Sequence, residues 1–462
     1  MSTPTTYDLL VIGSGQGGGP LAGAASSQGW NTALIERKHI GGSCVNEGCT
    51  PTKTMVASAR IAHLARRAED YGVQTGDVHV NLAQVRQRKR DIVKMFREGS
   101  RSGLESKGVK IYEGEASFVD SRTVEITYPD GSTERVRGER IVINTGTRPN
   151  IPPIDGIDTV EYLTSTTIME LDTVPERLLV LGGGYIGLEF GQMFSRFGSE
   201  VTVLQRGNQL LDREDSDVAD AVLDILRDEG LEIHLNAEAN AMRTTPEGEV
   251  SVTATLNGTT RTFSGSEVLM ATGRRPNSQA LNPAAAGIAV NDRGFIPVNE
   301  EFQTATDQIY AIGDITGGPA FTHVAYDDYR ILKDNLLNGA SRTVDNRLIP
   351  YTVFIDPQLG RVGLSEDQAR EGGHDIRVAQ IPMARVARAL ETDETRGFMK
   401  AIVDAETDQI LGATILGVEG GEIMSVLQMA MMGNVPYTAI RDGIFAHPTY
   451  AESLNNLFTA ME

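Results

Sequence analysis

The sequence predicts an α/β protein with two Rossmann-like dinucleotide-binding domains, followed by a C-terminal α+β domain. Two observations predict this fold. The order strand, glycine-rich turn, helix, strand occurs at residues 8–36 and returns at residues 178–204. Beyond about Arg347 the pattern changes to alternating apolar segments, which are typical of antiparallel strands. A chain of 462 residues is also too long for one ordinary hydrophobic core, so two or three domains are expected.

The first strand–turn–helix–strand unit begins with an apolar strand at residues 9–12. A glycine-rich turn follows at residues 13–18, then a small-residue helix through residue 28 and a strand at residues 32–35. Backbone amides of such a turn and the helix N-terminus can face a pyrophosphate, which makes Gly13, Gly15 and Gly18 candidate contacts. Eighteen positions after Gly18 stands Glu36, a carboxylate suited to accept hydrogen bonds from ribose hydroxyls.

The second unit repeats this order with a strand at residues 178–181, a helix through Phe197 and a strand at residues 201–204. The same count from the last glycine of its turn reaches Gln205, followed by Arg206. An acid at this position would repel a 2′-phosphate, whereas Gln205 and Arg206 leave room for one and supply positive charge. This favours NADPH. The alternative, that Arg206 is only a surface residue and NADH works equally well, stays open. The candidate contacts in the turn are Gly182, Gly184, Tyr185, Ile186 and Gly187.

A second repeat supports two related nucleotide-binding folds. Residues 145–150 closely match residues 272–277, and each segment follows an apolar strand, at residues 140–143 and 267–270. A further strand at residues 308–312 ends in Gly313-Asp314, where a carboxylate could meet a ligand at the carboxyl end of a sheet. The candidate nucleotide contacts here are Thr145, Gly146, Gly273 and Asp314. We expect domains at residues 1–150, 151–279, 280–346 and 347–462, with the first and third forming one domain.

Only two cysteines occur, Cys44 and Cys49, and they lie just before a predicted helix that begins near Pro51 and continues to about residue 70. The positive end of a helix dipole lowers the pKa of a thiol, and four intervening residues are enough to close a small reducible ring. This favours catalytic redox chemistry over two inert buried cysteines. A structural zinc site needs four ligands, so no metal site is expected.

The C-terminal region is predicted to hold antiparallel strands at residues 351–355, 398–403 and 410–416. An apolar stretch at residues 423–432 predicts a packed helix. Its methionines fit core or subunit-interface packing better than a metal site; they are Met424, Met429, Met431 and Met432.

The charge balance excludes several classes of partner. A formal net charge of −20 should repel nucleic acid and anionic membranes, and the acidic surface is expected to serve solubility. The local basic run at residues 86–90 is expected to be a solvated helix face. No apolar run approaches the length of a membrane span, and the N-terminus does not resemble a signal peptide, so a cytoplasmic location is expected.

The cysteine motif, with Pro51 and Lys53 behind it, resembles the redox-active segment of the pyridine nucleotide-disulfide oxidoreductases. This family includes dihydrolipoamide dehydrogenase, glutathione reductase and mercuric reductase. The resemblance covers essentially the whole chain, including both glycine motifs, Gly313-Asp314 and the C-terminal segment 447–452. It implies FAD at the first glycine motif, with Glu36 on the adenosine ribose and Asp314 near the ribityl chain. The further FAD contacts that it implies are Gly42, Ser43, Lys53, Ala116, Thr145 and Gly146.

The resemblance also implies roles in catalysis. Lys53 would sit beside the flavin ring, paired with Glu189, and Tyr185 would cover the flavin until nicotinamide arrives. Cys49 would be the thiol nearest the flavin, and Cys44 would attack the substrate. His447, oriented by Glu452, would be the acid–base group and would come from the partner subunit. The chain would therefore be a homodimer, with residues 347–462 forming its interface and dimerisation domain.

The acceptor is harder to infer. Residues 327–330, 386–390 and 393–400 resemble mercuric reductase. Against mercury itself, we expect neither a C-terminal cysteine pair that passes the metal inward nor an N-terminal metal-binding domain. His447 also stands where mercuric reductases carry another residue. The resemblance therefore implies a branch that reduces a small disulfide or a thiol-reactive acceptor such as hypothiocyanous acid or a metal ion such as copper(II). Two alternatives stay open. One is dihydrolipoamide dehydrogenase, against which Gln205-Arg206 counts, and the other is a non-enzymatic flavoprotein electron carrier.

Overall fold

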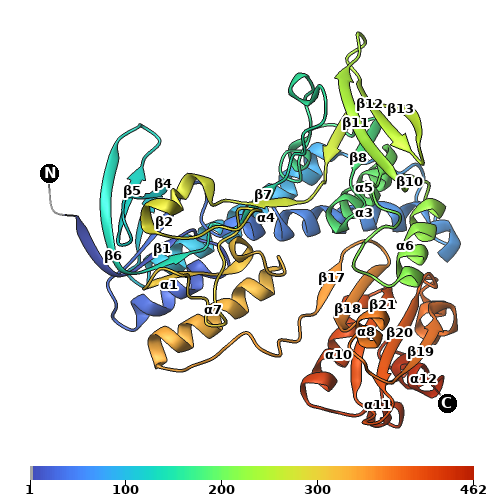
Figure 1. The fold of residues 1–462 in the computed structure, drawn as a ribbon. Helices are drawn as coiled ribbons and strands as arrows, with labels where there is room; N and C mark the ends of the chain where they lie inside the picture. The colour runs from blue at the N-terminus through green and yellow to red at the C-terminus, as the bar shows by residue number, and fades with distance from the viewer. Residues whose placement is uncertain (1–3, 462) are drawn as a thin grey trace. The chain divides into compact units, whose positions relative to one another are not determined.

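The computed structural model describes residues 4–461, which form two compact units (Figure 1). The first unit comprises the residues up to Met55, together with Gln84–Asn150 and Gly273–Arg347. The second comprises Val56–Ala83, Ile151–Thr272 and the residues from Leu348 onward. Helix α3 (Cys49–Arg66) contributes residues to both units.

The first unit is built on a seven-stranded sheet. Six strands follow the order β3-β2-β1-β6-β5-β4, and the seventh, β16, pairs with β6 outside this linear order. Parallel pairing joins five strands: β1 (Thr5–Ile12), β2 (Thr32–Glu36), β3 (Lys110–Glu113), β6 (Thr133–Ile143) and β16 (Ile309–Ala311). The other two strands pair in antiparallel fashion: β4 (Glu115–Phe118) and β5 (Thr123–Thr127).

Alternation along β1 explains why this sheet is buried on both faces. Leu9 and Val11 pack in one apolar cluster with residues of α1 (Gly18–Ser27) and α7 (Thr322–Asn338). Leu10 and Ile12 pack in another, with Phe118 of β4. The remaining elements of the unit include α2 (Gly42–Asn46), α4 (Leu82–Glu105), and the antiparallel pair β7 (Thr147–Pro149) and β15 (Arg274–Pro276).

The second unit contains a four-stranded parallel sheet with the order β10-β9-β8-β14. Its strands are β8 (Arg177–Leu181), β9 (Glu200–Leu204), β10 (Glu232–His234) and β14 (Glu267–Met270). Helix α5 (Tyr185–Phe197) joins β8 to β9, and α6 (Ser216–Asp228) joins β9 to β10. A three-stranded antiparallel sheet precedes β14: β11 (Ala237–Thr244), β12 (Val250–Leu256) and β13 (Thr259–Gly265).

The C-terminal part of this unit is a five-stranded antiparallel sheet with the order β17-β18-β21-β20-β19. Its strands are β17 (Tyr351–Val353), β18 (Gln358–Gly363), β19 (Ile376–Pro382), β20 (Phe398–Asp404) and β21 (Ile410–Gly417). The helices are α8 (Glu366–Glu371), α9 (Ala387–Glu391), α10 (Gly420–Met432), α11 (Tyr437–Arg441) and α12 (Ser453–Thr459). Met424 of α10 is buried in their core, whereas Met429 and Met432 are 64% and 61% exposed.

These elements confirm the predicted fold class of two nucleotide-binding α/β folds and a C-terminal α+β region. The division at residues 150, 279 and 346 stays a prediction. One expectation is wrong in part, because Lys89 in the basic run at 86–90 is only 3% exposed. It shares a stripe of α4 with the buried Leu82 and Val93, seven residues before it and four after it. The predicted helix after the cysteines also ends at Arg66, and a short 3₁₀ helix covers Ala68–Tyr71.

Within residues 4–461, no helix is both long enough and apolar enough to cross a membrane.

Candidate active site

The two glycine turns fold in the same way. Gly13 has φ +100°, and a Cβ there would lie 2.4 Å from the carbonyl oxygen of Asn144. Gly182 has φ +115°, and its Cβ would lie 2.4 Å from the carbonyl oxygen of Ala271. Each turn ends in a glycine, Gly18 or Gly187, whose Cβ would meet the carbonyl oxygen of the first glycine at 2.3 or 2.1 Å. A side chain at any of these positions would therefore clash with the backbone and prevent the helix from packing closely against the strand.

Glu36 and Gln205, the two residues predicted to contact a ribose, make equivalent hydrogen bonds in the two turns. Glu36 Oε2 accepts hydrogen bonds from the backbone N–H of Ser14 at 3.0 Å and from its hydroxyl at 2.6 Å. Gln205 Oε1 accepts one from the N–H of Gly183 at 2.9 Å, and its Nε2 donates to the carbonyl of Gln209 at 3.0 Å. The first turn thus carries a carboxylate where the second carries a neutral amide, and the Arg206 beside it is exposed.

The second turn has open space where a nucleotide would approach. A Cβ at Gly184 would meet no atom within 4 Å, and Tyr185 and Ile186 begin α5 half-buried. The first turn is more enclosed, because Gly15 faces the side chain of Asn144 and a Cβ at Gly42 would lie 2.6 Å from Gly15 Cα. Gly42 has φ +65° and starts α2, so the segment that carries the first cysteine packs directly on the glycine turn.

The two cysteines are not joined by a disulfide in this structure. Cys44 is half-buried in α2, and Cys49 is exposed at the start of α3. The Sγ atom of Cys49 lies 3.3 Å from the hydroxyl of Thr322, the first residue of α7. Sequence reasoning missed Thr322, because nothing local marks a hydroxyl 273 residues away from the thiol that it contacts.

The electrostatics of Cys44 differ from the expectation of a lowered thiol pKa. A hydrogen bond with Cys49, followed by burial, raises the pKa of Cys44 well above its ordinary value, and the opposing effects of Thr322 and Lys53 are smaller. Two adjacent thiols share one proton more readily than they lose both, so the second proton is held tightly. A base near Cys44 would therefore favour its conversion to the nucleophilic thiolate.

The residues at the carboxyl ends of β6 and β16 fit the FAD that the resemblance implies. The Thr145 hydroxyl is buried and has no hydrogen-bond partner among residues 4–461, and Gly146, at φ +62°, has open space around it. Asp314 Oδ2 accepts a 2.9 Å hydrogen bond from Thr147 Oγ1. An unsatisfied donor, an open backbone turn and a carboxylate are what a ribityl–pyrophosphate chain needs.

Other predicted residues divide between the two units. Ala116 is buried in β4, two residues after Gly114, whose N–H donates to the Glu36 carbonyl at 3.0 Å. Gly273 is exposed with φ +100°, and Ser43 is exposed in α2. Lys53 is half-buried in the first unit, whereas Glu189 belongs to the second, so their pairing stays a prediction.

Glu189 has a contact that the sequence did not reveal. Its side chain is 3% exposed on α5, and Oε1 accepts a 2.9 Å hydrogen bond from the backbone N–H of Phe354. Phe354 directly follows β17, so the carboxylate ties α5 to the C-terminal sheet inside the second unit.

His447 and Glu452 form the expected dyad. Nδ1 of His447 lies 3.0 and 2.9 Å from the two carboxylate oxygens of Glu452, and the histidine side chain is 67% exposed. A carboxylate on Nδ1 fixes that nitrogen as the donor and leaves Nε2 for proton transfer. The cysteines belong to the other unit, so the approach of the dyad to them stays a prediction.

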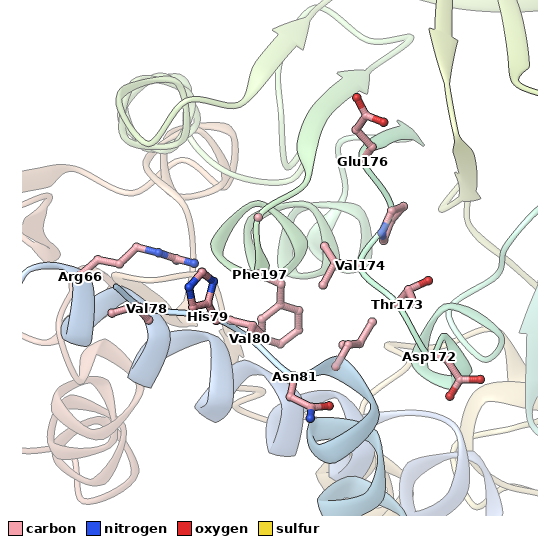
Figure 2. A pocket seen from close by; sticks show the side chains of 13 residues that line it. Arg66, Val78, His79, Val80, Asn81, Asp172, Thr173, Val174, Glu176 and Phe197 are labelled. Atoms are coloured by element: carbon pink, nitrogen blue, oxygen red, sulfur yellow. The ribbon is translucent and has the colours of Figure 1, made fainter. Parts of the chain in front are cut away.

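A pocket of about 560 Å³ lies elsewhere in the second unit, lined mainly by residues 78–82 and 172–176 with Arg66 and Phe197 (Figure 2). None of the predicted site residues lines it. Within residues 4–461, no three or more His, Cys, Asp or Glu side chains are grouped so that they could hold a metal ion.

Comparisons with known proteins agree with this geometry. The family model "Pyridine nucleotide-disulphide oxidoreductase" matches residues 7–328, and the dimerisation domain of that family matches residues 349–458. The probable pyridine nucleotide-disulfide oxidoreductase RclA of Escherichia coli K12 is 40% identical over 99% of both chains. The mercuric reductase of Lysinibacillus sphaericus is 36% identical over 97% of this chain and 81% of its own. The dihydrolipoyl dehydrogenase of Bacillus subtilis is 35% identical over 97% and 95%.

The solved structures give the same result. The HOCl-induced flavoprotein disulfide reductase RclA from Escherichia coli matches with a TM-score of 0.89 at 39% identity, over 99% of this chain and 100% of that one. Its Cu(II) complex matches with a TM-score of 0.90 at 39% identity, over 98% and 99%. The chain is therefore a member of the pyridine nucleotide-disulphide oxidoreductase family, an enzyme that uses FAD and NAD(P)H.

Proposed function

We propose that this enzyme transfers two electrons from NADPH through FAD and the Cys44–Cys49 pair to a small disulfide or another small thiol-reactive acceptor. The observation that carries the proposal is the cysteine pair itself. The two thiols share a hydrogen bond, Cys49 contacts Thr322, and α2, which carries Cys44, packs on the first glycine turn through Gly42. FAD, when bound there, supplies the two-electron exchange between nicotinamide and the disulfide.

The thiol chemistry balances without any further reductant. The Cys44 thiolate attacks one sulfur of a disulfide acceptor, forming a mixed disulfide and releasing the first thiolate, which takes up a proton. Cys49 then attacks the Cys44 sulfur, which closes the Cys44–Cys49 disulfide and releases the second thiol. One NADPH and one proton thus convert one disulfide to two thiols. With hypothiocyanous acid the same two attacks yield thiocyanate and water.

His447 is proposed as the acid–base group of this exchange. The pKa of Cys44 is raised by its neighbour Cys49, so a base that takes up a proton from this pair favours the attack at neutral pH. The Glu452 carboxylate on Nδ1 leaves Nε2 free to accept that proton and to return it to the departing thiolate. The dyad would serve the cysteine pair of a partner subunit in a homodimer, and the family's dimerisation domain at residues 349–458 supports this arrangement.

NADPH is proposed over NADH because of the second glycine turn. Gln205 holds the N–H of Gly183 through a neutral amide where Glu36 uses a carboxylate, so no negative charge faces a 2′-phosphate. Arg206 is exposed beside it and offers a cation. FAD would bind residues 1–150 and 280–346, NADPH residues 151–279, and the subunit interface would come from residues 347–462.

The relatives narrow the acceptor class. Similarity to an HOCl-induced disulfide reductase supports an oxidant or an oxidised thiol as acceptor, and the Cu(II) complex of that relative makes copper(II) a second acceptor to test. Dihydrolipoyl dehydrogenases are also similar, but the neutral Gln205 favours a reductase that draws on NADPH.

The test is an anaerobic titration of the purified enzyme with NADPH and with NADH, followed by candidate acceptors. The candidates are a low-molecular disulfide, hypothiocyanous acid and copper(II). We expect reoxidation by at least one of them in wild type. Cys44→Ser should abolish acceptor turnover, while reduction of bound FAD by NADPH stays intact. Full acceptor turnover by Cys44→Ser, or reoxidation only by oxygen and quinones, would show that the disulfide is not on the electron path.

A further inference from the structure

The peptide that joins Ile312 to Gly313 carries Asp314 out of strand β16. Gly313 has φ +74°, and a Cβ there would lie 2.8 Å from Nδ2 of Asn144 and 3.3 Å from Cβ of Ala325. The chain turns sharply here, between a strand and a short 3₁₀ helix, Gly313–Thr316. The orientation of this one peptide unit therefore decides where the Asp314 carboxylate points.

The carbonyl of this peptide is held by Asn144. Nδ2 of Asn144 donates to the Ile312 oxygen at 2.8 Å, and Oδ1 accepts from the Gly18 N–H at 2.9 Å. The side chain is 7% exposed and both ends of its amide are used. One buried side chain thus ties the last glycine of the first turn to the end of β16.

The N–H of the same peptide is held from another direction. Asp328 Oδ2 accepts from the Gly313 N–H at 2.8 Å, and Oδ1 accepts from Arg347 at 2.6 Å. Arg347 also pairs with Asp327 at 3.1 Å. Asp328 is 3% exposed, so a carboxylate has been taken out of water and given a guanidinium and a backbone amide as its partners.

The second half of the chain shows that the turn itself does not require this arrangement. The residue that corresponds to Asn144 is Ala271, since each precedes a Thr-Gly pair at the end of the strand that flanks the glycine turn. Both turns reach the same close glycine contacts. The hydrogen bonds of Asn144 are therefore not needed for the glycine turn itself. They serve a feature of the first nucleotide-binding fold, which carries Gly313 and Asp314.

We propose that Asn144 and Asp328 are positioning residues for FAD, which clamp the Ile312–Gly313 peptide at its carbonyl and its N–H so that Asp314 meets the ribityl chain. This rests on the proposed placement of FAD at the first glycine turn. It also gives a role to the acidic pair Asp327-Asp328, in which only Asp328 touches the peptide. Arg347 holds the Asp328 carboxylate in place.

The experiment measures FAD release from the holoenzyme by flavin fluorescence, and unfolding of the apoprotein by circular dichroism. The variants are Asn144→Ala, which installs the residue of the second half, and Asp328→Asn, which weakens the clamp with little change of shape. Asp327→Asn is the matched control, because it removes the other carboxylate that pairs with Arg347 and leaves the hydrogen bond to Gly313 intact. Asp314→Ala reports whether FAD lies at this site at all.

We expect Asn144→Ala to raise the FAD dissociation constant by about tenfold, the equivalent of one or two buried hydrogen bonds, and Asp328→Asn to raise it by less. Both clamp variants remove buried contacts, so they should also destabilise the apoprotein, but by less than they weaken FAD binding, and Asp327→Asn should retain FAD normally. Unchanged FAD affinity in both clamp variants, or equal losses of FAD affinity and apoprotein stability, would overturn the inference. If Asp314→Ala also leaves FAD binding unchanged, the placement of FAD is wrong; if it weakens FAD alone, only the clamp is wrong.

Discussion

Glu36 and Gln205 make the same contact in two related turns and differ by one charge. Each accepts a hydrogen bond from the N–H of the residue after the first glycine, at 3.0 and 2.9 Å. The hydrogen bond is therefore a requirement of the turn, and the charge is free to select the nucleotide. A carboxylate suits two ribose hydroxyls, whereas an amide tolerates a phosphate on one of them.

Gln205→Glu should therefore turn the enzyme away from NADPH. The substituted carboxylate keeps the bond from the Gly183 N–H and loses only the bond to the Gln209 carbonyl, so the turn should be retained, while its charge repels the 2′-phosphate. We expect kcat/KM for NADPH to fall by about tenfold to a hundredfold, with that for NADH unchanged or improved. Steady-state kinetics with both nucleotides measures this. Equal losses with both nucleotides would indicate damage to the turn instead.

The raised pKa of Cys44 gives the second prediction at this scale. The raised pKa lowers the thiolate fraction of Cys44 at neutral pH, and that fraction grows as pH rises. With His447 in place the proton is removed within the reaction. His447→Gln should lower acceptor turnover near neutral pH by about 10²-fold or more, and the remaining rate should climb steadily into alkaline solution.

The pH profile of kcat/KM for the acceptor measures this effect. Glu452→Gln should show a smaller loss, because the imidazole remains, and FAD reduction by NADPH should not change in either variant. A neutral-pH optimum that survives His447→Gln would mean that another group removes the Cys44 proton.

At the scale of elements, the second glycine turn contains one glycine that the fold requires, Gly187, and one that leaves space for a nucleotide, Gly184. Gly184 has φ −81°, and a Cβ there would enter open space, whereas a Cβ on Gly187 would lie 2.1 Å from the Gly182 oxygen. Gly184→Ala should therefore fold normally and raise KM for NADPH, because the methyl group occupies space that the pyrophosphate needs. Gly187→Ala should lower the melting temperature. Thermal unfolding and KM together test this, and a destabilised Gly184→Ala would contradict it.

Element prediction from the sequence was best where the pattern was local. Strand β14 and the strands after each glycine turn follow from short apolar runs, and the antiparallel strands β20 and β21 follow from alternation. The sheet of β11–β13 was missed because two of its strands are largely polar, with only Phe263 and Gly265 buried in β13. Thr322, Asn144 and Asp328 were missed as site residues because their partners are distant in sequence.

At the scale of the whole molecule, the residues of the proposed thiol exchange divide between the two units. The cysteine pair, Thr322 and the first glycine turn belong to the first unit, and the His447–Glu452 dyad belongs to the second. The dyad is assembled within one chain but exposed, which suits a group that is offered to another surface. Met429 and Met432 of α10 are exposed apolar side chains in the same C-terminal region, as a subunit interface would need.

A subunit-mixing experiment tests whether His447 serves the partner. Cys44→Ser and His447→Gln are each expected to be nearly inactive toward the acceptor as homodimers. In a hybrid dimer, one site combines an intact cysteine pair with an intact His447 from the other chain, and the second site lacks both. Random mixing makes half of the dimers hybrid, each with one working site of two, so about a quarter of wild-type turnover should return.

Co-expression of the two variants with different affinity tags allows the hybrids to be purified, and these should show about half of wild-type turnover per dimer. Mixing either variant with itself is the control, and it should recover nothing. If the purified hybrids stay inactive although they are dimeric, His447 acts within its own chain. Each chain would then have to bring its second unit to its own cysteines, and the homodimer would have no part in assembling the site.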